Sequence, residues 1–177
     1  MTPTRVLITG CSGGGKSTLI SELVRRGHTP VAEPGRRVIA AERAAGGDGL
    51  PWINPRRFAR ACLAMATTDW SQAGPGLTFF DRGVVDAAVA LRRLGEDAGA
   101  EVALQKCRYD RVIVAPPWRE LFLADPDPDR RHGFPAAEME YHAILDRLRG
   151  LELCADTLPK TNVVARADWL ETLLRTR

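Results

Sequence analysis

The amino-acid sequence predicts an α/β fold, a three-layer α/β/α sandwich around a five-stranded parallel sheet. Short apolar runs alternate with longer segments of helical periodicity, which is typical of βαβ units with helices on both faces of a sheet. The first apolar run leads directly into a glycine-rich loop and a helix. With 177 residues, of which 45% are hydrophobic, the chain can bury a full core, and we expect one domain over residues 1–177.

Five short apolar segments are expected to form the strands. Each is flanked by turn-forming or charged residues; the third, for example, follows Gly74-Pro75-Gly76, and the fourth ends at Pro116-Pro117. The fifth has the weakest pattern. The expected strands cover residues 4–9, 29–32, 77–80, 111–115 and 151–154.

Helical periodicity and stop signals predict helices between and after these strands. Gly27 is expected to end the first helix, while Pro135 can occupy the first position of a helix that Gly150 ends. Residues 117–134 are rich in proline, aspartate and arginine and are interpreted as a mobile lid. The expected helices cover residues 15–26, 34–45, 55–73, 83–95, 99–107, 135–149 and 164–175.

The glycine-rich loop after the first strand fits the pattern G-x-x-x-x-G-K-[ST] and predicts ATP binding. Its glycines allow successive N–H groups to turn toward an anion, and the following helix begins with the positive end of its dipole. Lys16 is expected to bridge the β- and γ-phosphates, and Ser17 to offer its hydroxyl to Mg²⁺. The alternative, an ordinary glycine turn, is disfavoured by the strand and helix on either side. The nucleotide-binding residues are Gly10, Cys11, Ser12, Gly13, Gly14, Gly15, Lys16, Ser17 and Thr18.

Polar residues after the second strand are candidates for binding and activating a phosphate acceptor. Ligands of open α/β sheets bind at the carboxyl ends of the strands, where Glu33 is expected to accept a proton from an attacking hydroxyl. The alternative is a carboxylate that only favours a helix N-terminus. Arg36 and Arg37 oppose that helix dipole, which indicates another task, such as contact with the acceptor. Trp52 and Phe58 are either pocket or core residues.

The third strand ends in an acid followed by a cation. Asp81 is expected to hold the shell of Mg²⁺, and Arg82 to contact a phosphate or the acceptor, although a loop salt bridge would also explain the pair. In the lid, arginines are expected to neutralise charge on the transferring phosphate. Solvated pairing with neighbouring aspartates is the alternative there. The lid arginines are Arg119, Arg130 and Arg131.

Composition excludes several other classes of protein. The net charge of +3 comes from 25 basic and 22 acidic residues without blocks of like charge, so nucleic-acid binding is not indicated. The four cysteines show no zinc or disulfide spacing. Neither a secretory leader nor an apolar run long enough for a membrane span is visible, and we expect a cytoplasmic monomer or homodimer with no membrane partner.

These motifs together resemble a bacterial family of small AAA-type ATPase domains among the P-loop NTPases, which is similar to nucleoside and nucleotide kinases. The resemblance covers about residues 4–155 and includes the phosphate loop, Glu33-Pro34, Asp81-Arg82-Gly83 and the Pro-Pro-Trp-Arg run at 116–119. It implies that Glu33 matches the base of deoxynucleoside kinases and that Asp81-Arg82 matches their acid-arginine pair. Gly83 stands where those kinases have serine.

The leading hypothesis is a small-molecule kinase that transfers the ATP γ-phosphate, with Mg²⁺, to a hydroxyl or phosphate of a nucleoside or nucleotide. The alternative is an ATPase or nucleotide-dependent switch that acts on a protein partner. An oligomeric motor is disfavoured because no acid pair follows an apolar strand, and a GTPase because Asn-Lys-x-Asp is missing. A nucleic-acid end kinase has little support from the charge pattern.

Overall fold

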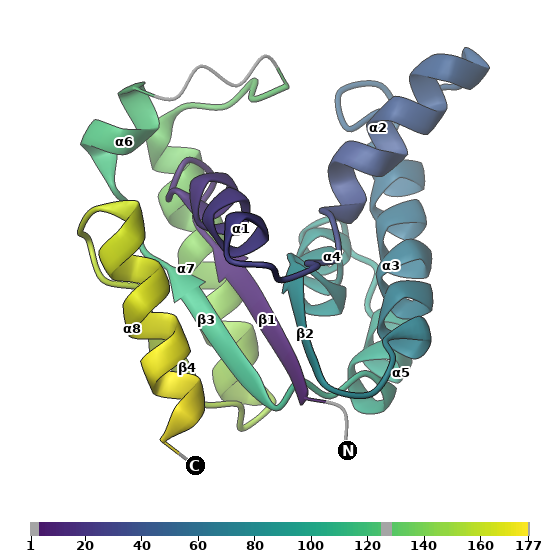
Figure 1. Cartoon of the computed structure of the whole chain (residues 1–177). Helices are drawn as coiled ribbons and strands as arrows, with labels where there is room; N and C mark the ends of the chain where they lie inside the picture. The colour runs from purple at the N-terminus through teal and green to yellow at the C-terminus, as the bar shows by residue number, and fades with distance from the viewer. Residues whose placement is uncertain (1–3, 125–128, 177) are drawn as a thin grey trace. The chain divides into compact units, whose positions relative to one another are not determined.

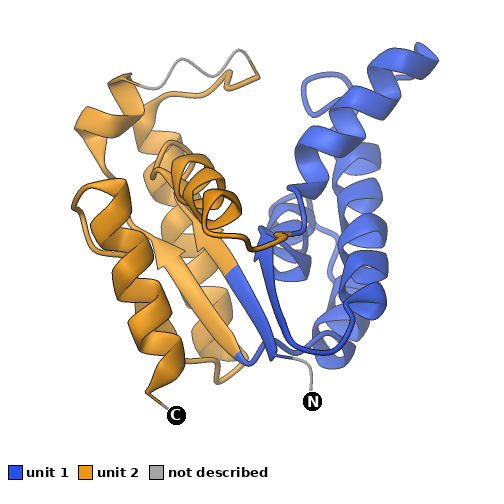
Figure 2. Ribbon diagram, viewed as in Figure 1, with its two compact units in different colours: residues 1–7, 31–110 blue, residues 8–30, 111–177 orange. Residues whose placement is uncertain are grey.

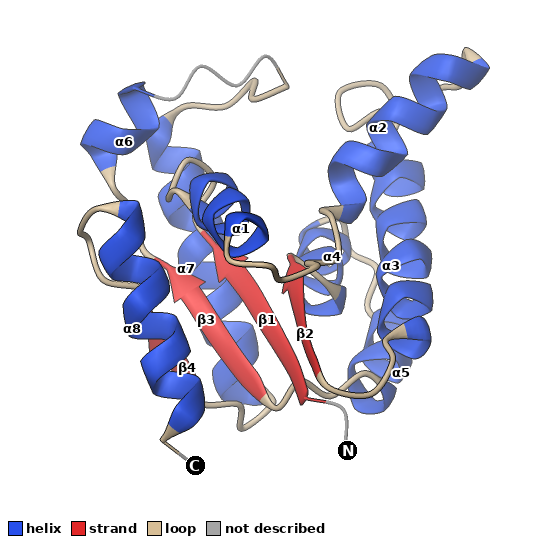
Figure 3. Cartoon of the chain, viewed as in Figure 1, coloured by secondary structure: helices blue, strands red, loops and turns tan. Residues whose placement is uncertain are grey.

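The computed structural model describes residues 4–124 and 129–176, which form an α/β structure (Figures 1 and 3). The strands within this part of the chain are β1 (Thr4–Gly10), β2 (Leu77–Asp81), β3 (Arg111–Ala115) and β4 (Ala155–Thr157). The helices are α1 (Lys16–Arg25), α2 (Pro34–Ala45), α3 (Pro55–Gln72), α4 (Val84–Arg93), α5 (Ala98–Lys106), α6 (Arg119–Ala124), α7 (Phe134–Gly150) and α8 (Val163–Arg175). None of these helices combines the length and apolar character that crossing a membrane requires.

The strands form one sheet in the order β2-β1-β3-β4. β3 and β4 are parallel, with Val112 opposite Ala155 and Val114 opposite Thr157. The central strands are buried along continuous runs, since Val6 to Ile8 and Val112 to Ala115 are almost fully shielded from solvent. Such runs are typical of parallel strands that helices cover on both faces. The predicted α/β fold with a parallel sheet is therefore confirmed.

The sheet has four strands rather than the predicted five, and residues 29–32 account for one difference. Of residues 29–32, only Val31 pairs with β2, through an isolated parallel bridge to Phe80. Its N–H donates to the Phe79 carbonyl at 2.8 Å, and its carbonyl accepts from the Asp81 N–H at 3.0 Å. Pro30 has no N–H to add to a ladder, and α2 begins only three residues after Val31. The segment is too short to extend into a strand.

The prediction of a strand at residues 151–154 is also wrong. The C-terminal end of α7 extends through Gly150, and the Leu151 N–H donates to the Arg147 carbonyl at 3.1 Å. Glu152 then takes the left-handed conformation, with φ at 55°, and the chain turns out of the helix. Pairing with β3 starts only at Ala155, so the apolar residues before it complete a helix end.

The chain divides into two compact units (Figure 2). Unit 1 comprises Met1–Leu7 and Val31–Asp110, and unit 2 comprises Ile8–Pro30 and Arg111–Arg177. β1 runs from the first unit into the second. Unit 1 therefore contains β2 and α2 to α5, while unit 2 contains β3, β4, α1 and α6 to α8.

In unit 1, the helices pack around α3, which contacts α2, α4 and α5. Val38, Cys62 and Ala87 form a buried cluster against which Phe58 packs. Phe58 is partly buried against this cluster, as expected for the core role, one of the two that its sequence position allowed. The rings of Phe80 and Tyr109 meet in a T-shaped arrangement, with centroids 5.4 Å apart.

In unit 2, α1 and α8 lie on one face of the sheet and α7 lies on the other (Figure 1). Their buried residues include Leu23 on α1, Ile144 on α7 and Leu170 on α8, all fully shielded. Within this unit, helices cover both faces, as the three-layer prediction requires.

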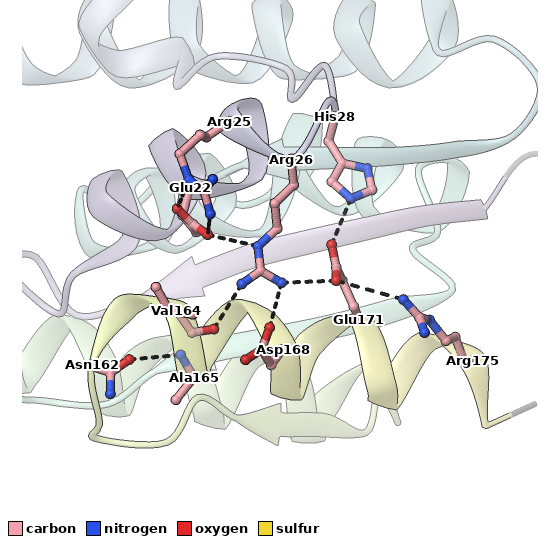
Figure 4. Close-up of polar contacts among 10 residues, drawn as sticks. All are labelled: Glu22, Arg25, Arg26, His28, Asn162, Val164, Ala165, Asp168, Glu171 and Arg175. Atoms are coloured by element: carbon pink, nitrogen blue, oxygen red, sulfur yellow. Dashed lines mark hydrogen bonds and ion pairs between the residues drawn. The ribbon is translucent and has the colours of Figure 1, made fainter.

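An ion-pair network joins α1 to α8 (Figure 4). Arg26 lies at its centre and contacts Glu22 at 2.8 Å, Asp168 at 2.8 Å and Glu171 at 3.0 Å. Its Nη2 also donates to the Val164 carbonyl at 3.1 Å. The Arg26 side chain is only 15% exposed, although its partner Asp168 is 64% exposed, and these charge-assisted contacts link the first turns of α8 to α1.

We expect the contribution of this network to the free energy of unfolding to be lost at acid pH. Hydrogen bonds from Arg25 and then Arg26 lower the pKa of Glu22 from 4.5 to about 2. A carboxylate with a depressed folded-state pKa stabilises the protein above its unfolded pKa and loses that contribution as pH falls toward the folded value. Glu22→Gln should therefore lower the denaturation midpoint at neutral pH, and the gap to wild type should narrow between pH 4.5 and about 2. A gap that stays constant across this range would contradict the assignment.

Candidate active site

The phosphate loop lies in unit 2, between β1 and α1. Gly10 has a φ of 111°, and a Cβ there would collide with the backbone of Ala115 on β3. The Cys11 N–H donates to the Ala115 carbonyl at 2.9 Å, so the start of the loop is fixed to the sheet. Gly15 caps α1 in the left-handed conformation, with φ at 79°. Glycine is required at both positions because a side chain would meet strain or backbone atoms.

Lys16 is the first residue of α1 and is only 7% exposed. Its ammonium donates to the Cys11 carbonyl at 2.7 Å and to the Gly10 carbonyl at 3.3 Å. A buried ammonium beside the N-terminus of a helix creates a strongly positive site, which favours a phosphate.

The hydroxyl groups that follow Lys16 differ in their contacts. Ser17 is exposed, and its hydroxyl makes no hydrogen bond within the described residues. Thr18 Oγ1 donates to the Gly15 carbonyl at 2.8 Å. A hydroxyl oxygen is a hard ligand of the kind that Mg²⁺ prefers, and Mg²⁺ in nucleotide sites takes most of its other ligands from water and phosphates. Ser17 therefore fits the expected Mg²⁺ contact.

Cys11 and the predicted lid share a small apolar cluster in unit 2. Cys11 is buried with Phe122 and Ala137, and Phe134 packs against them. Arg130 Nη1 donates to the Phe122 carbonyl at 2.8 Å, and its guanidinium carbon lies 4.4 Å from the centre of the Phe122 ring. Packing alone therefore explains a small residue at position 11.

The other lid arginines, Arg119 at the start of α6 and Arg131, are exposed. Asp125 and Asp127, two of the aspartates that could pair with Arg130 and Arg131, lie outside the described residues, as does the part of the predicted lid at 125–128. The mobility of residues 117–134 stays a prediction. The structure adds the short helix α6, which the sequence pattern did not predict.

Unit 1 contains the other candidate residues, and three of them form a cluster with Asp86 that we call the Glu33 cluster: Glu33, Arg36, Arg82 and Asp86. Glu33 precedes α2, and its Oε2 accepts from Arg36 Nε at 3.1 Å. Its Oε1 lies 3.4 Å from Arg82 Nε. Arg82 Nη1 donates in turn to Asp86 Oδ1 at 2.8 Å. Arg82 is thus held between two carboxylates, and Glu33 between two arginines.

Arg82 adopts an unusual backbone conformation at the start of α4. Its φ is 61°, a value that residues with a Cβ rarely take. Asp86 stabilises this turn because its second oxygen accepts from the Gly83 N–H at 3.0 Å. Such local strain is found preferentially at functional sites. Asp86 was not among the residues predicted from the sequence. Its position four residues after Arg82 could have indicated an ion pair between the two side chains.

The remaining candidates in unit 1 have separate contacts. Arg37 Nη1 donates to Asp69 Oδ2 on α3 at 2.7 Å, so Arg37 is not part of the Glu33 cluster. The Trp52 ring lies 5.4 Å from the guanidinium carbon of Arg43. Asp81 ends β2 and is only 7% exposed. The structure therefore brings Glu33, Arg36 and Arg82 together within unit 1 and leaves Arg37 and Trp52 outside that cluster.

Gly83 is in a position with no room for a side chain. A Cβ would collide with the Tyr109 hydroxyl and approach Leu7 Cδ1 to 3.1 Å. If the Tyr109 hydroxyl moved away, it would lose the hydrogen bond that it accepts from the Val84 N–H at 3.2 Å. Burial of this ring also raises the pKa of Tyr109, which keeps the phenol neutral. This contact explains why the chain has glycine where deoxynucleoside kinases have serine.

We expect Gly83→Ser to lower the free energy of unfolding by about 1–3 kcal/mol, the usual cost of overpacking. Gly99→Ala is a matched control in the same unit, because nothing lies within 4 Å of its Cβ position. In a helix that change should be neutral or stabilising by up to about 1 kcal/mol. Urea denaturation of both variants measures the difference, and equal stabilities would contradict the proposed packing.

A parallel α/β structure with a glycine-rich phosphate loop between β1 and α1 defines a P-loop nucleotide-binding protein. The family model described as AAA domain matches residues 5–166. The chain belongs to this family, which confirms the family that its motifs resemble. No curated protein sequence matches the chain.

Solved structures of two kinases and of the NadR protein show the same fold. The deoxyadenosine kinase from M. mycoides, solved with dCMP and dCDP, has a TM-score of 0.71 and 14% identity, covering 98% of this chain and all of the kinase. The NadR protein in complex with NR has a TM-score of 0.67 and 18% identity over 99% of this chain and 52% of NadR. Shikimate kinase from Acinetobacter baumannii, bound to shikimate, has a TM-score of 0.58 and 18% identity, with 98% and 92% coverage. At these identities the similarity establishes the fold.

Proposed function

We propose that the protein is a small-molecule kinase that transfers the γ-phosphate of ATP to a hydroxyl or phosphate of an acceptor such as a nucleoside or nucleotide. The observation that carries the proposal is the Glu33 cluster. A chain that only held a nucleotide would need its phosphate loop alone, whereas this chain also contains a half-buried carboxylate fixed by two arginines. The fold similarity to deoxyadenosine kinase and to shikimate kinase supports the same class.

The proposal assigns the donor residues as follows. The loop from Gly10 to Thr18 binds the ATP phosphates through its backbone N–H groups, and Lys16 places a positive charge on the β- and γ-phosphates. Ser17 and Asp81 are the candidates for binding Mg²⁺, which would neutralise charge on the phosphates when bound. Arg119, Arg130 and Arg131 are candidates for stabilising the transferring group.

The acceptor residues are assigned to unit 1. Glu33 accepts the proton of the attacking hydroxyl while the new bond forms between that oxygen and the γ-phosphorus. The bond from the γ-phosphorus to the β–γ bridging oxygen breaks, so that ADP leaves with the electron pair. Arg82 and Arg36 orient Glu33 and contact the acceptor, and Arg37 and Trp52 are further candidates for acceptor binding.

A panel of nucleosides, nucleotides and related alcohols, including shikimate, tests the proposal. With ATP and Mg²⁺ we expect ADP formation that depends strongly on one acceptor class, and removal of Mg²⁺ with a chelator should abolish it. ADP formation at the same rate with every compound, and without any, would instead support the alternative, an ATPase or nucleotide-dependent switch that acts on a protein partner.

A further inference from the structure

Arg166, in the first turn of α8, lies against the phosphate loop although it is 151 residues away from Gly15 in sequence. It is only 4% exposed. Its Nη1 donates to the Gly15 carbonyl at 3.3 Å and lies 3.5 Å from the Gly14 carbonyl. Its guanidinium carbon is 5.5 Å from the centre of the Trp118 ring. No local sequence signal marks this contact.

The guanidinium of Arg166 is buried without a carboxylate. It makes no ion pair within the described part of the chain, and its Nε has no hydrogen-bond partner there. Burial accordingly lowers the pKa of Arg166. Burying a cation without an opposite charge lowers the stability of the folded protein. If residue 166 only filled space, an apolar side chain would give a more stable protein.

Contacts of another arginine already hold α8. That role belongs to Arg26, which binds Asp168, Glu171 and the Val164 carbonyl on the same helix (Figure 4). These contacts fix α8 on both sides of Arg166 in sequence. The docked helix therefore carries the guanidinium to the loop, where Gly15 has no side chain to exclude it.

The carbonyls that Arg166 contacts belong to the peptide groups that carry the N–H of Gly15 and the N–H of Lys16. In a phosphate loop the N–H groups turn toward the anion, and the carbonyls of the same planar peptides point away from it. A cation that donates to these carbonyls fixes the orientation of both peptide planes. It also polarises them, which strengthens the opposite N–H groups as donors.

We propose that Arg166 is a positioning residue for phosphate binding: it acts through the Gly14 and Gly15 carbonyls to orient and strengthen the N–H groups of Gly15 and Lys16. This inference rests on the proposed function, because it assumes that the loop binds the phosphates of a nucleotide. It predicts an effect on phosphate recognition and none on the nucleoside part of the ligand.

Arg166→Met tests the inference, because it keeps a long apolar side chain and removes every donor. The affinities of ATP, tripolyphosphate and adenosine are measured by calorimetry for the wild type and the variant. We expect the Kd of ATP and of tripolyphosphate to rise about tenfold, the effect of losing charge-assisted hydrogen bonds, and adenosine binding to stay unchanged. Arg175→Met, an exposed change on the same helix, should leave all three affinities unchanged.

Three outcomes would overturn the inference. Unchanged affinity for ATP with a lower melting temperature would show a purely structural role. Weaker binding of adenosine but not of tripolyphosphate would show a nucleobase contact shared with Trp118. If the wild type does not bind ATP, both this inference and the proposed function fail. If the wild type and Arg166→Met bind ATP equally, only this inference is overturned. Arg166→Lys, which keeps the charge but not the planar fork, should weaken both phosphate ligands less than Arg166→Met.

Discussion

Lys16→Ala is expected to lower kcat/KM for phosphoryl transfer by about 10²- to 10³-fold, the usual cost of removing one preorganised donor from a transferring group. The reason is the position of its ammonium, which is buried in the loop and donates to the Gly10 and Cys11 carbonyls. Charge at this point stabilises the phosphates more in the transition state than in the bound ATP.

The fold should survive the Lys16→Ala change, because the loop stays anchored to β3 through Cys11 and Ala115. Circular dichroism and thermal unfolding check this point. Lys160→Ala removes an exposed lysine of the same unit and is the matched control for net charge. A Lys16→Ala protein that phosphorylates its acceptor at the wild-type rate would show that the site is assigned wrongly.

Glu33→Gln is expected to reduce acceptor phosphorylation by about 10²- to 10⁴-fold, the range that general base catalysis contributes. Glutamine keeps the shape of the side chain and can still accept a hydrogen bond from Arg36 or Arg82, but it cannot take a proton. ATP affinity should be unchanged, because the change leaves the phosphate loop intact. Transfer kinetics and ATP binding measured on the same preparation separate the two effects.

Glu96→Gln is the matched control for Glu33→Gln. Glu96 also lies in unit 1, its side chain is also 21% exposed, and it is also paired with two arginines, Arg56 and Arg60. Loss of a surface ion pair should leave transfer unchanged. If Glu33→Gln retains full transfer, or if Glu96→Gln loses as much, Glu33 is not the base and the switch becomes the better explanation.

Those parts of the molecule that depend on local chemistry could be predicted from the sequence. The phosphate loop, the start of α2 at Pro34 and the start of α3 at Pro55 follow from residue types and spacing over a few positions. The family and the parallel α/β fold followed from the same signals.

Features that depend on distant contacts were not predictable in this way. The strand expected at residues 29–32 had suitable apolar residues, but its length depended on Pro30 and on how soon α2 begins. Arg37 was selected for opposing a helix dipole, and only the fold shows Asp69 opposite it. Arg166 contacts the loop because it lies on α8, 151 residues after Gly15. No sequence pattern near residue 15 could indicate this contact.

The single bridge at Val31 also bears on how the protein avoids aggregation. β2 is an edge strand of the sheet, and such an edge can pair with another chain when its backbone groups are open. Val31 satisfies the Phe79 carbonyl and the Asp81 N–H, and Pro30 just before it offers no donor to an incoming strand. The same segment that is too short to form a fifth strand therefore takes up two backbone groups of this edge that an incoming strand would otherwise use.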